Sequence, residues 1–178
     1  MMVSSRSVVA AVCVAAAGVF GASGVAAAQP APPPPPPPPP NVNAYAPANP
    51  QDFAVYGGSS YAFTTAGLTC MVQRSGPYGC SGVLPGAPNG ANLVSGRSGV
   101  VPGFGSVGGP IVTEPVNALP PNTRISFGTV SCGGDGTTTA CVDSVNQSGF
   151  VVSPGATWVV NQVNPLVARP EGTNPYFN

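Results

Sequence analysis

The chain has 178 residues with only five Lys or Arg, five Asp or Glu and no His, so its formal net charge is zero. Nucleic acids and anionic membrane surfaces bind proteins through clustered cations. The few arginines are scattered along the sequence, so we expect neither kind of partner.

The first 28 residues have the pattern of a secretory signal peptide. Arg6 precedes an apolar stretch over residues 8–20, and small residues at 26–28 suit cleavage between Ala28 and Gln29. A retained membrane anchor is the alternative, but the stretch is rich in Ala, Val and Gly and lacks Leu and Ile, which weakens insertion. We therefore predict a secreted chain with no membrane span after cleavage.

Residues 29–50 are predicted to be a disordered, proline-rich linker. Nine consecutive prolines occupy residues 32–40, and proline lacks the backbone donor that helices and sheets need. Such a run adopts polyproline II and acts as a stiff spacer. It could also be a ligand for an aromatic-lined groove on another protein.

Four cysteines follow the linker, and an even number in an exported chain indicates disulfides. Turn-rich segments separate Cys70 from Cys80 and Cys132 from Cys141, which favours local pairing across hairpins. A long-range link between the two hairpins is the alternative. With no His and no close Cys pair, we expect no metal and no other cofactor.

Residues 51–163 are predicted to form an all-β domain, a small disulfide-stapled sandwich or barrel, followed by a partly ordered tail at 164–178. Apolar and polar residues alternate in short segments between Gly and Pro. Residues 96–110 are predicted to be a loop, and Gly128 a bulge within a strand. The expected large core side chains are Phe63, Phe127, Phe150 and Trp158. The expected strands are 61–65, 68–73, 82–84, 93–95, 111–114, 125–132, 138–143, 149–153 and 157–161.

The two cysteine hairpins resemble each other in sequence. Residues 67–70 and 128–132 each lead with Gly and end on the first cysteine of a hairpin, and the second cysteine follows after a turn. Duplication of a hairpin explains this likeness, and so does chance similarity between two disulfide hairpins.

The sequence contains no convincing catalytic motif, and we expect a protein that is not an enzyme. Without His or Lys, a serine nucleophile has no ordinary activating base. A carboxylate pair formed by Asp135 and Asp143 would support a secreted hydrolase, but turn formation and solvation explain both residues. A candidate contact loop contains Arg74, Pro77 and Tyr78, since Arg and Tyr are enriched at binding hot spots.

The chain resembles a family of secreted, cysteine-containing β-domain proteins of actinobacteria, especially mycobacteria, that carry a Pro-rich N-terminal spacer. The residues that carry the likeness lie at 67–70, 128–132 and 148–153, with Phe63, residues 119–120 and residues 140–141. The resemblance implies a small exported β domain and supplies no established activity. No functional residue is transferred from it.

The sequence thus favours an exported, non-enzymatic module with a binding or structural role at the cell envelope. Its partner would be a cell-wall component or an envelope protein, and its location extracellular or cell-wall-associated. The alternatives are a secreted carboxylate-dependent hydrolase and a secreted inhibitor or effector that presents the disulfide-stiffened loop at 74–78.

Overall fold

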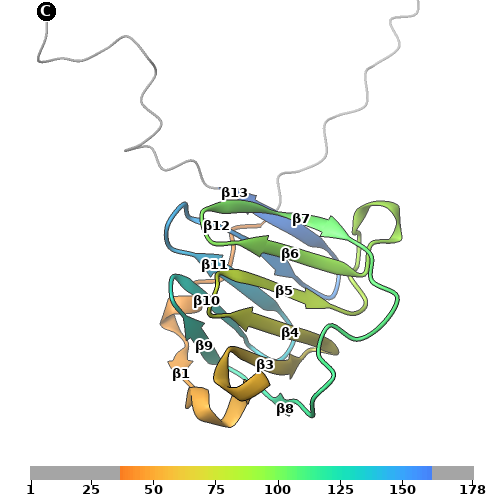
Figure 1. Ribbon diagram of the computed structural model, residues 1–178. Coiled ribbons are helices and arrows are strands. Elements are labelled where there is room, and N and C mark those ends of the chain that lie inside the picture. Colours follow the sequence, from red (N-terminus) through yellow and green to blue (C-terminus); the bar gives the residue numbers. More distant parts are fainter. Residues whose placement is uncertain (1–36, 162–178) are drawn as a thin grey trace, which may run out of the picture. The chain divides into compact units, whose positions relative to one another are not determined.

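Two five-stranded antiparallel meanders dominate residues 37–161, the part of the chain that the computed structural model describes (Figure 1). The predicted signal peptide, its cleavage site at Ala28 and Gln29, most of the proline run and the predicted tail lie outside these residues. The first sheet contains β2 (Ala54–Val55), β3 (Ser60–Thr65), β4 (Leu68–Gln73), β5 (Pro77–Ser81), β6 (Leu93–Arg97), β7 (Val100–Gly105) and β8 (Asn117–Ala118).

The second sheet contains β1 (Ala46–Pro47), β9 (Thr123–Phe127), β10 (Val130–Gly134), β11 (Thr139–Asp143), β12 (Ser148–Val152) and β13 (Thr157–Asn161). Short 3-10 helices occur at η1 (Val42–Ala44), η2 (Pro50–Phe53), η3 (Tyr56–Gly58) and η4 (Pro88–Gly90). The described residues are therefore all-β, as the sequence predicts. None of the helices in this part of the chain is long and apolar enough to cross a membrane.

Each meander begins with a tight hairpin whose turn needs left-handed backbone. Ala66 and Gly67 have φ of 46° and 77°, and two positive values suit the turn that follows the twist of paired strands. Gly128, with φ of 61°, takes the corresponding place between β9 and β10. The predicted bulge at Gly128 is wrong, because Val130 pairs back onto Phe127 across a hairpin.

A disulfide links the second and third strands of each meander. Cys70 and Cys80 are direct cross-strand partners, and so are Cys132 and Cys141. The Cα atoms are 4.0 Å apart in each bridge. Local pairing is confirmed, and the alternative of a long-range link between the hairpins is wrong. Both bridges are fully buried between the sheets.

The core lies between the two sheets and includes both disulfides. Phe63 and Phe150 are buried as predicted. Phe127 is only half-buried and stacks on Tyr61 with ring centroids 4.4 Å apart. Trp158 is also half-buried, and it packs on the outer face of the second sheet rather than in the main core.

The segment before each meander pairs with the opposite sheet. β1 precedes the first meander but lies parallel to β9 of the second, and β8 precedes the second meander but lies parallel to β3 of the first. The Ala46 N–H donates to the main-chain carbonyl oxygen of Asn122 at 3.1 Å, and the Leu119 N–H donates to that of Thr64 at 2.9 Å. The two halves of the domain therefore exchange their leading strands.

The packed part of the chain begins earlier than the predicted boundary near Gln51. Val42 in η1 is buried, and β1 pairs with β9. Residues 41–50 are therefore part of the domain and not of a disordered linker. Their Asn, Ala and Pro composition suggests a linker, but their position is fixed by contacts with a sheet that lies about 80 residues further along the chain.

Two strands and two loops differ from the prediction. β7 lies within the predicted loop at 96–110; it is an edge strand, where a proline such as Pro102 is tolerated. β5 begins at Pro77, inside the segment expected to be a turn. Residues 82–84 and 111–114, predicted as strands, are irregular, because neither segment finds a partner strand.

Candidate functional site

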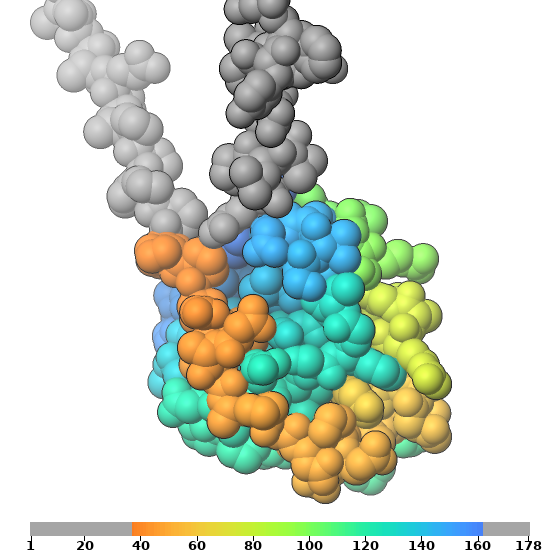
Figure 2. Space-filling model, turned by 90° about the vertical axis from the view of Figure 1, so that its left-hand side faces the viewer, coloured from red at the N-terminus to blue at the C-terminus, as the bar shows by residue number. Residues whose placement is uncertain are grey.

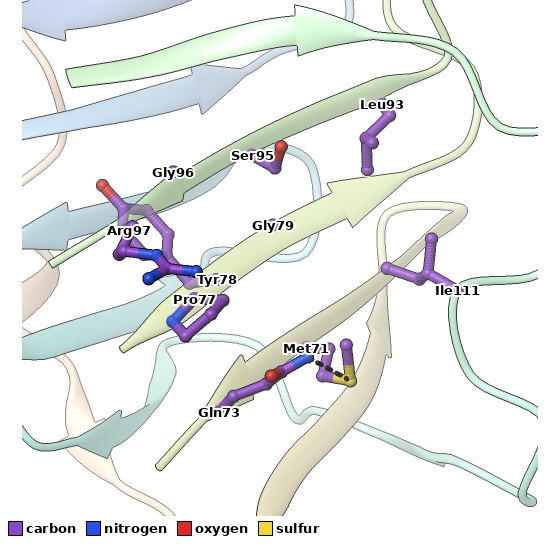
Figure 3. A pocket seen from close by; sticks show the side chains of 10 residues that line it. All are labelled: Met71, Gln73, Pro77, Tyr78, Gly79, Leu93, Ser95, Gly96, Arg97 and Ile111. Carbon is purple, nitrogen blue, oxygen red and sulfur yellow. Dashed lines mark hydrogen bonds between the residues drawn. The ribbon is translucent and has the colours of Figure 1, made fainter. Parts of the chain in front are cut away.

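The outer face of the first sheet carries an open, mainly apolar groove with a volume of about 310 Å³. It follows β5 between β4 and β6, as Figure 3 shows. Met71 and Ile111 border it on the β4 side, and Leu93 and Ser95 border it on the β6 side. Concave apolar surfaces of this size are the usual sites for small ligands, so this groove is the candidate site.

The floor of the groove is Gly79, which leaves the centre of the site without a side chain. Met71, Gly79 and Ser95 are cross-strand neighbours on three adjacent strands, so they share one face of the sheet. A Cβ atom on Gly79 would lie 2.7 Å from the Val94 carbonyl oxygen and 2.8 Å from the Ser95 Cβ. The close approach of β5 and β6 therefore requires glycine, and this glycine gives the groove its depth.

Polar side chains stand at one end of the groove. Arg97 is exposed at the end of β6. Within residues 37–161, the Gln73 Nε2 donates to the Met71 sulfur alone, 3.9 Å away, and a thioether is a weak acceptor. Leu93 and Ile111 lie toward the opposite end (Figure 3), so the groove has a cationic end and an apolar end.

The connection between the two meanders, residues 106–116, covers the neighbouring part of the same face. The Asn92 side chain holds it with two hydrogen bonds to Val107, of 2.9 Å to the carbonyl and 2.8 Å from the N–H. Further along, Val112 is buried against Val55 and Ala62. This connection shields β3 and part of β4 but leaves the surface above β5 and β6 open.

The outer face of the second sheet is filled at the equivalent place. Gly79 and Ala140 each directly precede the second cysteine of a disulfide, and their partners on the next strand are Ser95 and Val151. Val42 of η1 packs on Ala140 and Val151. In Figure 2 this N-terminal segment (orange) lies against the strands of the second sheet.

The next strand of each sheet shows the same difference between small outward residues in the first sheet and large ones in the second. Ser95 pairs with Gly103 on β7, whereas Val151 pairs with Trp158 on β13. All five residues of β12 are buried, whereas Val94 is the one buried residue of β6. Thus β12 of the second sheet has a covered apolar outer face, whereas its equivalent in the first sheet, β6, borders an open groove.

The structure divides the predicted contact loop. Arg74 is exposed in the β4–β5 turn, and Pro77 is half-buried at the cationic end of the groove. Tyr78 is buried and stacks on Phe150 with ring centroids 6.0 Å apart, and it also borders the polar end of the groove. The sequence carries a signal for this, because Tyr78 shares the alternating phase of the buried Cys80.

Burial changes the chemistry of the Tyr78 phenol. The pKa of Tyr78 is raised to about 12, because burial disfavours the phenolate; the Ser148 hydroxyl lowers this pKa, and the negative charge of Asp143 raises it again. The phenol is therefore neutral at physiological pH. It supports the wall between the core and the groove rather than acting as an acid or base.

The two candidate catalytic carboxylates lie at opposite ends of β11. Four residue steps of about 3.4 Å separate the strand ends, too far for a shared catalytic dyad. Asp135 accepts hydrogen bonds from the N–H groups of Thr137 and Thr138 and shapes the β10–β11 turn. Asp143 is fully buried, so the expectation that it is solvated is wrong.

Asp143 instead connects the two halves of the domain. Its carboxylate accepts hydrogen bonds from Gly99, in the β6–β7 turn, at 2.5 Å and from Val145 at 3.1 Å. Burial raises the pKa of Asp143, but these N–H groups and the hydroxyls of Thr129 and Ser98 lower it by more, so that the net shift is downward. A buried anion with these donors has a structural role.

No cluster of three or more His, Cys, Asp or Glu side chains among residues 37–161 could hold a metal ion. The chain matches no protein-family model, no curated protein and no solved structure. The predicted resemblance to secreted actinobacterial proteins therefore stays a prediction, and the function has to be inferred from the groove itself.

Proposed function

We propose that this protein is an exported, non-enzymatic binding module of the cell envelope, and that the groove above Gly79 is its binding surface. One observation carries the proposal. The outer face of the second sheet is packed and covered by Val42, whereas the equivalent face of the first sheet is open and apolar. An apolar surface that the chain does not cover is typical of a ligand-binding groove.

The chemistry of the described residues favours binding over catalysis. The groove contains no carboxylate, and the chain contains no His. Asp135 and Asp143, on which the hydrolase alternative depends, lie apart and are engaged in a turn and a buried network. The inhibitor alternative loses Tyr78 from its presenting loop, because that side chain is buried.

An extracellular location agrees with the covalent structure. The two buried disulfides, Cys70–Cys80 and Cys132–Cys141, are of the kind that persists in oxidising compartments. The predicted signal peptide would deliver the chain there, and the predicted proline spacer would hold the domain away from an attachment point. A cell-wall component or an envelope protein is the partner class that we propose.

The test is a retention assay with a groove-filling variant. Purified wild-type protein and the Ser95→Leu variant are mixed with isolated envelope fractions, and the bound share is measured after sedimentation. We expect the wild type to sediment with the envelope and Ser95→Leu to stay in solution, because leucine would lie above Gly79. Ser144→Leu, which makes the same change at an exposed turn, is the control and should bind like the wild type. Equal retention of Ser95→Leu and wild type, or no retention of either, would contradict the proposal.

A further inference from the structure

We propose that the groove binds a single-chain anionic amphiphile, with a linear alkyl chain lying over Gly79 and a carboxylate head at Arg97 and Gln73. This inference rests on the proposed function to the extent that both use the same groove. It adds the chemical class of the ligand and the direction in which the ligand lies.

The apolar part of the groove suits an alkyl chain better than a peptide. Its walls are the side chains of Met71, Leu93 and Ile111. The main-chain N–H and C=O groups of β4, β5 and β6 are already paired within the sheet. A peptide laid over this face would lose water from its own backbone groups and find few partners, which is costly. An alkyl chain has no polar groups to satisfy.

The glycine floor favours a thin ligand in close contact with the sheet. Gly79 carries no side chain and is buried at the bottom of the groove, where the Ser95 Cβ and the Val94 carbonyl oxygen close in on it. A thin linear chain can lie over Gly79 between the lining side chains and gain contact with them along its length. The second sheet shows that the fold accepts an apolar group here, because Val42 occupies the equivalent position above Ala140 and Val151.

Charge complementarity fixes the head group as an anion. Arg97 offers a guanidinium with several donors at the polar end, and Gln73 offers an amide whose donor meets only a thioether. The acidic residues of the described chain are engaged elsewhere, for example Glu114 with the Tyr56 N–H at 3.0 Å. No carboxylate lines the groove, so a carboxylate head is attracted and a cationic head is repelled.

The experiment compares three probes of equal chain length, decanoate, decanol and decyltrimethylammonium, each below its micelle concentration. Binding to the intact, oxidised protein is followed by two-dimensional amide NMR. We expect decanoate to shift the amide signals of Gly79 and Ser95 and to leave those of Ala140 and Val151, the equivalent residues of the covered face, unchanged. We expect decanoate to bind at least about threefold more tightly than decanol, as one partly exposed ion pair allows, and the ammonium probe to bind most weakly.

Two variants locate the head group and the chain. Arg97→Gln should remove the preference for decanoate over decanol, whereas Arg74→Gln, which removes a neighbouring arginine outside the groove, should retain it. Ser95→Leu should abolish the shift at Gly79 for every probe. Equal affinity for all three probes, a preference that survives Arg97→Gln, or shifts centred on Ala140 would each overturn the assignment.

The result separates this inference from the proposed function. If envelope retention depends on Ser95 but decanoate does not bind, the groove is a binding surface for another class of ligand and the amphiphile assignment is wrong. If decanoate binds as described while Ser95→Leu remains bound to the envelope, the ligand class stands and the envelope role is wrong.

Discussion

The two halves of the domain have the same framework and opposite outer faces. Each has five strands in the same order, with a buried disulfide between the second and third strands. On the outer faces, Gly79, Ser95 and Gly103 of the first sheet replace Ala140, Val151 and Trp158 of the second. The inward residues therefore maintain the fold. The outward residues differ, and they form a groove in the first sheet and a covered apolar face in the second.

The comparison also shows how the halves are held together. Each sheet receives a short parallel strand from the segment that precedes the other meander, β1 on β9 and β8 on β3. Asp143 adds a charged link from the second half to Gly99 in the first. Neither half contains all the pieces of its own sheet, and this favours one cooperative unit over two independent ones.

The strongest test of equivalence is removal of each disulfide in turn. We expect Cys70→Ala with Cys80→Ala, and separately Cys132→Ala with Cys141→Ala, to lower the free energy of unfolding by about 3 kcal/mol each, because each bridge closes a loop of similar length in the unfolded chain. Urea unfolding of the two double variants measures both values. Costs that differ by more than about 2 kcal/mol would show that the two halves do not contribute equally.

The link through Asp143 should have the next largest effect. Asp143→Asn removes the charge that accepts hydrogen bonds from Gly99 and Val145, and we expect it to lower the free energy of unfolding by about 2 kcal/mol at neutral pH. Because the folded-state pKa of Asp143 is lowered, its contribution is complete above the unfolded-state value of about 3.9 and is lost as the pH falls below it.

Urea midpoints measured between about pH 6 and pH 2 test this dependence on the acid side. The wild type should lose stability steeply below about pH 4, and Asp143→Asn should lose it less steeply. Some acid sensitivity should remain, since hydrogen bonds from Thr138 and Thr137 also lower the pKa of Asp135. Parallel curves for the two proteins would show that Asp143 does not supply the acid sensitivity.

Sequence alone predicts the features that local patterns specify. Alternation of apolar and polar residues locates β4, and the turn residues between the cysteines predict both disulfides. The two-residue strands β1 and β8 carry no such pattern, because parallel pairing with a distant strand defines them. Their exchange between the sheets is a property of the tertiary structure.

The candidate site was harder to predict for a related reason. The groove depends on Gly79 lying between Met71 and Ser95, and that register is fixed by two strand pairings rather than by a motif. The burial of Asp143 likewise depends on Gly99, which lies in another hairpin. In a sequence, glycine and serine are residues with low strand propensity and indicate no site. They form a groove only when strand pairing places them side by side on one face of the sheet.

The covering segments offer a third and smaller comparison. Val42 covers the second sheet and Val112 covers part of the first. We expect Val42→Ala and Val112→Ala each to lower the free energy of unfolding by about 1–2 kcal/mol, from lost apolar burial. Val42→Ala should also shift the fluorescence of Trp158, the one tryptophan of the chain, toward that of an exposed indole. Val112→Ala is the matched control, and an equal shift there would contradict separate covers.

The smallest expected effect is also the most direct test of why the faces differ. Ser95→Val gives the first sheet the residue that the second has at Val151. If the outer face above β5 carries no structural constraint, this change should alter the free energy of unfolding by less than about 0.5 kcal/mol. The reverse change, Val151→Ser, removes a buried side chain from beneath Val42 and should cost clearly more. Urea unfolding of both variants measures the difference between the two changes in the free energy of unfolding.

A large loss of stability in Ser95→Val would mean that serine is needed for packing against Gly79. The open face would then be a consequence of strand packing and not a surface kept free for a ligand.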